Sequence, residues 1–286
     1  MRILYLDCFS GISGDMTLGS LVHLGADRHS IEQELSKLGL EQEYTLVWKS
    51  VVKKGIAALK ADVIVRDGRE QAGPPHGHKH GASHKHSHRR YADIVHLIER
   101  AELPVRAAKL SLAIFEKIGA AEAKIHDIPL EDVVFHEVGA VDSIIDIVGA
   151  ALAIDQLNPD RIVSSPIPLG SGVVRIEHGM YPVPAPATLE MMRGLPIAPS
   201  NHEVELTTPT GAGIIAAVVD EFSPSLPPMI VEAIGYGAGT RELPNQPNVL
   251  RSVIGIYEKR LAVWPAPHAE HLESAHGHNE HHHRGQ

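Results

Sequence analysis

Several residue types are scarce in this chain of 286 residues, and each scarcity excludes a class of protein. A single cysteine, Cys8, cannot form an internal disulfide framework and favours a reducing compartment, so we expect a cytoplasmic protein. Few aromatic rings (4 Phe, 6 Tyr, 2 Trp) and a net charge of −9 at pH 7 disfavour binding to nucleic acid. No run approaches the roughly 20 apolar residues of a membrane helix, and residues 1–16 lack the pattern of a signal peptide.

Histidine is abundant instead, with 20 copies concentrated in two segments that lack a periodic apolar face. We expect both segments, a loop at residues 73–90 and a tail at residues 261–286, to be disordered. Imidazoles alternating with Gly, Lys and Ser can converge on nickel, copper or zinc, and the residue types alone do not separate these ions. The alternatives are a His-biased polar linker and, for the tail, a cloning remnant. The candidate metal ligands of the loop are His76, His78, His80, His84, His86 and His88.

The remaining sequence, residues 1–260, predicts one domain of the α+β class, a mixed α/β core with a helical middle section. We expect strands at residues 2–7, 44–52, 57–65, 161–165, 171–176, 203–207, 229–235 and 250–257. We expect helices at residues 15–25, 30–38 and 211–222, and a helical stretch over residues 91–157 broken near Pro104, Pro129 and Gly139.

The turn FSGISGD joins the first strand to the first helix and is a candidate anion site. Its candidate phosphate-binding residues are Gly11, Ser13 and Gly14. Asp7 closes the strand and Asp15 opens the helix, so the two carboxylates could face one cleft and hold a divalent cation. The simpler alternative is a tight turn followed by an acidic residue that the helix dipole favours. Cys8 could donate a thiolate to nickel, or it is a small buried residue.

The segment FHEVGAVDSIIDIVGA, residues 135–150, places His136 and Glu137 just before a helix. Asp142 and Asp146 share one face of that helix, where like charges repel unless a cation or a basic group lies near. This repulsion indicates a site, and we take His136, Glu137 and Asp142 as candidate catalytic residues. The alternative is the solvated polar face of an amphipathic helix.

Two later segments offer further anion-binding groups. TTPTGAG, residues 207–213, ends a strand and opens a helix, and its candidates are Thr208, Thr210 and Gly211. A capped turn without a ligand explains this segment equally well. GYGAGTRELPNQPNVLR, residues 235–251, adds Arg241, whose guanidinium suits a phosphate or a carboxylate.

Taken together, six motifs in order over residues 1–257 resemble the LarC family of nickel insertion proteins: YLDCFSGISGDM, the His-rich loop, FHEVGAVDSIIDIVG, HGMYPVPAPAT, TTPTGAG and GYGAGTRELPNQPNVLR. The resemblance implies insertion of Ni²⁺ into pyridinium-3,5-bisthiocarboxylic acid mononucleotide, which completes the nickel pincer cofactor of lactate racemase and related enzymes. In the family this is a CTP-dependent cyclometallation that forms Ni–S and Ni–C bonds, with Mg²⁺ or Mn²⁺ accompanying CTP.

The resemblance also implies roles for the candidate residues. The loop histidines would collect Ni²⁺, the two Gly-containing turns would hold phosphates, and His136 or Glu137 would take a ring proton. LarC proteins carry a further C-terminal domain associated with nucleotide binding, so we expect a separately encoded subunit to supply it, and a homo-oligomeric assembly. The competing hypotheses are a non-catalytic nickel chaperone or store and an unrelated phosphate-binding hydrolase.

Overall fold

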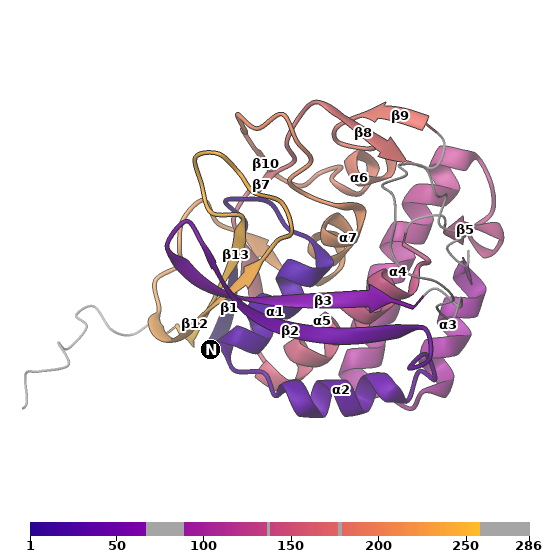
Figure 1. Ribbon diagram of the computed structural model, residues 1–286, viewed down its shortest axis with the longest axis horizontal. Coiled ribbons are helices and arrows are strands. Elements are labelled where there is room, and N and C mark those ends of the chain that lie inside the picture. The colour runs from indigo at the N-terminus through magenta and orange to yellow at the C-terminus, as the bar shows by residue number, and fades with distance from the viewer. Residues whose placement is uncertain (67–88, 136–137, 177–178, 258–286) are drawn as a thin grey trace, which may run out of the picture.

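The structure, a computed structural model, describes residues 1–66, 89–135, 138–176 and 179–257 (Figure 1). Helices and a mixed sheet combine in these residues, which confirms the predicted α+β class. The histidines of the predicted loop and the tail at residues 261–286 lie outside the described residues. The prediction of a loop to residue 90 is wrong at its end, because Arg89–Arg90 form strand β4, which pairs with β5 (Val134–Phe135).

A seven-stranded sheet in the order β11-β6-β1-β13-β12-β3-β2 forms the centre of the fold. Strand β1 is an interior strand next to the central β13, to which it is antiparallel, and it is parallel to β6, so segments from opposite ends of the described chain are direct neighbours. The strands are β1 (Arg2–Asp7), β2 (Tyr44–Lys53), β3 (Ile56–Val65), β6 (Arg161–Ser164), β11 (Glu221–Phe222), β12 (Ile230–Ala238) and β13 (Val249–Ile256).

Helices cover this sheet in successive layers. Helix α1 lies directly on β12, β3 and β13, α5 packs on α1, and α4 packs on both α5 and α7. Because α1 and α5 are enclosed on several sides, apolar residues cover most of their circumference. The helices are α1 (Gly14–Leu24), α2 (Arg28–Ser36), α3 (Tyr91–Arg100), α4 (Val105–His126), α5 (Val141–Leu157), α6 (Pro186–Met191) and α7 (Pro209–Val218), with a 3₁₀ turn at Leu130–Asp132.

Small residues allow α1 to lie unusually close to the sheet. A Cβ at Gly237 would come within 1.8 Å of the Met16 carbonyl oxygen, and one at Gly235 within 2.2 Å of the Ser20 carbonyl oxygen. These glycines of the GYGAG motif therefore lie in β12 and serve packing, not a flexible anion-binding loop.

Two hairpins extend from the core. Strands β2 and β3 form a long hairpin that crosses the molecule toward α3 and α4 (Figure 1). Lys54 and Gly55 form its two-residue turn with positive φ values of 48° and 85°, as the sequence predicts. The second hairpin joins β8 (Val173–Ile176) and β9 (Gly179–Pro182), and a short parallel pair joins β7 (Ile167–Pro168) and β10 (Ile197–Ala198).

Two predicted elements are wrong in part. Residues 203–207 form isolated bridges, Glu205 to Gly170 and Thr207 to Ile12, where a strand was expected. The helix expected to reach residue 222 ends at Val218, because Val219 turns to extended backbone and leads into β11. Among the described helices, none has the length and apolar character needed to cross a membrane.

Candidate functional site

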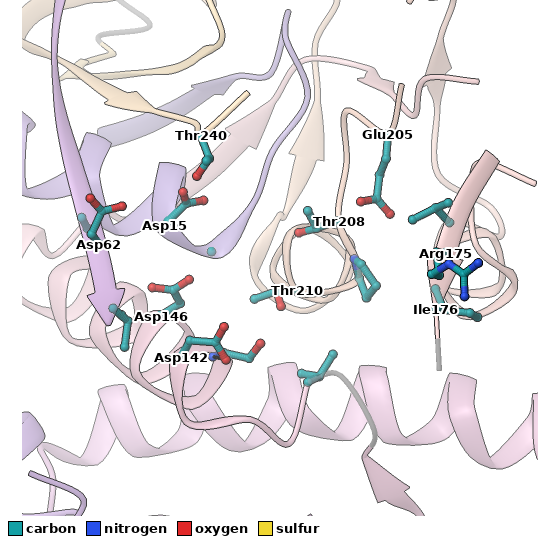
Figure 2. Close-up of a pocket in the computed structure, with 17 residues that line it drawn as sticks. Asp15, Asp62, Asp142, Asp146, Arg175, Ile176, Glu205, Thr208, Thr210 and Thr240 are labelled. Atoms are coloured by element: carbon teal, nitrogen blue, oxygen red, sulfur yellow. Dashed lines mark hydrogen bonds between the residues drawn. The ribbon is translucent and has the colours of Figure 1, made fainter. Parts of the chain in front are cut away.

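Helices α1, α5 and α7 begin around one cavity of about 480 Å³ (Figure 2). This volume lies in the range typical of small-molecule sites. The cavity is lined by residues from three helix starts, from β3, from β8 and from the segment before α7: Gly14, Asp15, Ala61, Asp62, Val63, Val138, Asp142, Ser143, Asp146, Val174, Arg175, Ile176, Glu205, Thr208, Pro209, Thr210 and Thr240.

The first glycine turn and the TTPTGAG segment, far apart in sequence, form one structural unit. The Thr208 amide donates to the Ile12 carbonyl at 3.1 Å, next to the bridge between Ile12 and Thr207. A Cβ at Gly11, where φ is 83°, would meet the Leu206 carbonyl oxygen at 2.0 Å, and one at Gly211 would meet the Ile12 carbonyl oxygen at 2.1 Å. The structure thus gives Gly11 and Gly211 a packing role, and neither is among the residues lining this cavity.

One side of the cavity carries four carboxylates, Asp15, Asp62, Asp142 and Asp146, which we call the acidic wall (Figure 2). Asp15 and Asp142 lie in the first turns of α1 and α5, where the helix dipole stabilises negative charge. Lys60 bridges part of the wall, since its Nζ lies 3.1 Å from Asp15 Oδ2 and 3.0 Å from Asp62 Oδ1.

These contacts alter the pKa values of Lys60 and Asp62. Burial disfavours the charged form of Lys60, but its contacts with Asp15 and Asp62 outweigh burial and raise its pKa. Burial likewise opposes ionisation of Asp62, whereas its hydrogen bonds with Lys49 and Lys60 hold its pKa below the usual value. Both side chains are therefore charged at neutral pH.

Asp146 differs from the rest of the acidic wall. Its Oδ1 atom is buried and has no hydrogen-bond partner in the part of the chain that the structure describes. Burial, followed by repulsion from Asp15 and Asp142, holds the pKa of Asp146 well above its usual value, and the positive charge of Lys60 only partly opposes this. Gly14 packs directly against it, because a Cβ at Gly14 would lie 2.6 Å from Asp146 Cβ and 2.9 Å from Thr210 Cγ2.

The opposite side of the cavity offers groups of another kind. Thr208 caps α7 by accepting a hydrogen bond from the Gly211 amide at 3.2 Å, and Thr210 lies beside it in the first turn. Arg175, from β8, faces the same space and makes no ion pair with any described residue (Figure 2). A helix start, a hydroxyl and an unpaired guanidinium suit an anion.

A smaller cavity of about 200 Å³ adjoins the first and shares Asp15, Glu205, Thr208 and Thr240 with it. Ser13 and Arg241, both candidate anion-binding residues, line this second space. Arg241 donates to the Glu205 carbonyl at 3.0 Å, and its Nη2 lies 3.7 Å from the Glu205 carboxylate. Burial raises the pKa of Glu205, while Arg241 opposes that change.

Other candidates lie apart from the cavity or outside the described residues. Asp7 accepts a hydrogen bond from Arg251 Nε at 2.9 Å and does not line the cavity with Asp15. Cys8 is fully buried, and burial raises the pKa of its thiol to about 12. His136, Glu137 and the six loop histidines lie outside the described residues. Among the residues that are described, no three His, Cys, Asp or Glu side chains are placed to hold a metal ion.

Sequence reasoning missed four residues of the cavity as site candidates. Asp62 alternates with Lys60 along β3, a pattern that looks like an ordinary exposed strand face, and Glu205 and Arg175 belong to no motif. Asp146 carried a signal, its spacing of four residues from Asp142, but that spacing gives no information on burial.

A known protein family matches the part of the chain that carries the six sequence motifs. The family model described as "Nickel insertion protein" matches residues 4–282. The chain belongs to the nickel insertion protein family. The resemblance to LarC proteins that the motifs indicate is thereby confirmed.

Several relatives bear the name pyridinium-3,5-bisthiocarboxylic acid mononucleotide nickel insertion protein, among them the following three. The protein from Geobacillus kaustophilus is 56% identical over 255 residues, covering 89% of this chain and 60% of the relative. The Clostridium kluyveri protein is 46% identical over 264 residues, covering 92% and 64%. The Staphylococcus epidermidis protein is 44% identical over 252 residues, covering 88% and 59%. The matched region thus spans about 60% of these relatives. No solved structure matches the chain.

Proposed function

We propose that this chain acts in the insertion of Ni²⁺ into pyridinium-3,5-bisthiocarboxylic acid mononucleotide, the molecule named in its relatives. The observation that carries this proposal is the cavity itself, where the acidic wall faces Thr208, Thr210 and Arg175 (Figure 2). The carboxylates attract a divalent cation, and the opposite side attracts an anion. Nickel is the cation to be transferred, and the mononucleotide phosphate is the anion.

The chemistry of the substrate fits this division. Its two thiocarboxylate groups, at ring positions 3 and 5, provide sulfur ligands that hold nickel better than carboxylate oxygens do. The acidic wall forms no preformed cage among the described residues, so nickel held there would remain free to pass to sulfur. We propose that the wall, with Asp15 and Asp142 at two helix starts, delivers Ni²⁺ while Thr208 and Thr210 orient the phosphate.

The finer steps of the reaction are also proposals. Nickel bound by both sulfurs lies over ring carbon 4, and closing a Ni–C bond requires that this carbon lose its proton. CTP with Mg²⁺ or Mn²⁺ would drive the reaction. The described residues include no cluster suited to a resident metal ion, so we derive no step through Mg²⁺ or Mn²⁺. The recipient would be an apoenzyme of the lactate racemase type.

The test is anaerobic incubation of the full chain with Ni²⁺, the mononucleotide and Mg²⁺ or Mn²⁺, with and without CTP. Formation of the nickel-containing product is followed by mass spectrometry, and its function is checked by activation of apo lactate racemase. Product formation supports the proposal, and dependence on added CTP identifies the nucleotide requirement. Absence of product in every condition, including one with a C-terminal subunit from a relative, contradicts it.

The second candidate function, a nickel chaperone or store, is favoured by the His-rich loop alone. Replacing the six loop histidines by alanine separates the two. A store would lose its function together with its bound nickel. An insertase would lose nickel binding at low concentration but would still form product when Ni²⁺ is saturating, because the described cavity is unchanged.

A further inference from the structure

The inference concerns Asp146, whose carboxylate has a different environment from the other members of the acidic wall. Asp15 accepts hydrogen bonds from the Met16 amide at 2.9 Å and from Ser13, and it pairs with Lys60. Asp62 pairs with Lys49 and Lys60. These two carboxylates are satisfied within the protein. Asp146 Oδ1 is buried without any such partner among the described residues, although it lies on the cavity wall.

A buried, unpaired acceptor is costly, so its presence needs a reason. Charge repulsion adds to the cost, since Asp15 on α1, Asp142 on α5 and Asp62 on β3 all face Asp146, and only Lys60 opposes them. Gly14 packs against the side chain, because a Cβ at Gly14 would lie 2.6 Å from Asp146 Cβ. The fold therefore maintains, at the wall of the cavity, a carboxylate with one oxygen that no described residue satisfies.

We propose that Asp146 is the catalytic base that accepts the proton from ring carbon 4 of the substrate. This rests on the proposed function, and it assigns the proton to a residue of α5 instead of to His136 or Glu137. Ni²⁺ held by both sulfurs approaches carbon 4, the electron pair of the C–H bond becomes the Ni–C bond, and the proton moves to the Asp146 carboxylate. Nickel stays divalent, and no oxidant or reductant is needed.

The environment of Asp146 suits this role. A carboxylate with an ordinary pKa is a weak base at neutral pH, whereas burial and repulsion from Asp15 and Asp142 raise the affinity of Asp146 for a proton.

The test uses the mononucleotide with deuterium at ring carbon 4 and follows loss of that deuterium by mass spectrometry in the full chain with Ni²⁺ and CTP. Asp146→Asn keeps the size of the side chain and removes the base. We expect deuterium loss at saturating Ni²⁺ to slow about 100-fold or more, while binding of the mononucleotide, measured by calorimetry, is unchanged. The sulfur-bound nickel complex, still carrying deuterium, should accumulate.

Three comparisons make the result specific. Asp155→Asn changes a partly exposed carboxylate further along α5 and should leave the rate unaltered. Asp146→Glu should restore part of the activity with a shifted pH profile, whereas the residual activity of Asp146→Asn should lose the pH dependence due to this group. The assignment of Asp146 as the base would be overturned if wild type and Asp146→Asn lost deuterium at equal rates. It would also be overturned if only His136→Ala or Glu137→Gln abolished deuterium loss. Either result would leave the proposed function standing. Absence of deuterium loss with the wild-type chain in every condition of the insertion assay would overturn the proposed function as well.

Discussion

Gly14 lies against Asp146, and a Cβ at position 14 would come within 2.6 Å of Asp146 Cβ and 2.7 Å of its Oδ2. The contact joins the first turn of α1 to the second turn of α5, and Thr210 of α7 completes it at 2.9 Å. The first turns of α1 and α7 and the second turn of α5 therefore meet at position 14, where the space admits glycine and no larger residue. The relationship makes Gly14 a structural determinant of the cavity.

The first prediction concerns this contact. Gly14→Ala should lower the free energy of unfolding by about 1–3 kcal/mol, because the added methyl group displaces Asp146 or Thr210 in a tightly packed region. Product formation should fall further than stability alone explains. Chemical denaturation and the insertion assay measure the two effects. Ser36→Ala, at the exposed end of α2, is the control and should change neither. Full activity of Gly14→Ala would show that the position of Asp146 is not critical.

The second prediction concerns the cost of the Asp146 charge. The pKa of Asp146 is higher in the folded protein than in the unfolded chain, so the folded protein binds the Asp146 proton more tightly. The free energy of unfolding therefore decreases as the pH rises from about 4 toward the raised pKa. Asp146→Asn should therefore be more stable than wild type at pH 7, by about 1–3 kcal/mol. The difference should shrink on acidification. Thermal unfolding at a series of pH values tests this, and Asp155→Asn should show no such trend.

The third prediction concerns Lys60. Lys60→Met removes the positive charge that bridges Asp15 and Asp62, so we expect a loss of about 1–3 kcal/mol of stability at neutral pH. Since the folded pKa of Lys60 is raised, its contribution is complete below its unfolded pKa near 10.5 and is lost only above that value. The pH profile of product formation should also move upward, because Lys60 is the group that lowers the pKa of Asp146. Lys54→Met, in the β2–β3 turn, provides the control. An unchanged profile would mean that Lys60 has no electrostatic effect on Asp146.

The fourth prediction concerns Cys8. Its thiol is fully buried with a pKa of about 12, so the folded chain should react very slowly with a thiol reagent at pH 8. The same chain unfolded in urea should react at the rate of a free cysteine. Cys8→Ala should bind as much Ni²⁺ as wild type, measured by equilibrium dialysis. Reduced nickel binding by this variant would restore the thiolate as a candidate ligand.

Much of the fold is predictable because its patterns are local. Alternation of residue types in β2 and β3 and the Lys-Lys-Gly turn between them predict that hairpin, and the apolar run of β1 predicts a buried interior strand. Residues 203–207 look like a strand by the same rule. They instead form single β-bridges, one of them to Ile12 in the first glycine turn. Gly11 and Gly211 allow these two backbone segments, which are distant in sequence, to approach closely.

The site is less predictable because its residues act through relationships that are not local. Asp15, Asp142 and Thr208 are visible as residues at helix starts, and the cavity brings them together. The ion pairs of Lys60 and the position of the Arg175 guanidinium at the cavity depend on how β3 and β8 lie against those helices. The spacing of four residues between Asp142 and Asp146 places both on one face of α5, but it does not predict that one oxygen atom of Asp146 is buried.

The pairing of β1 with β13, from Arg2 opposite Ile256 to Asp7 opposite Arg251, has a consequence for the order of synthesis. Helix α1 extends from β1 and lies on both β12 and β13, so the sheet beneath the cavity requires strands that are made after all four residues of the acidic wall. The sheet under α1 is therefore complete only once residue 256 has been synthesised.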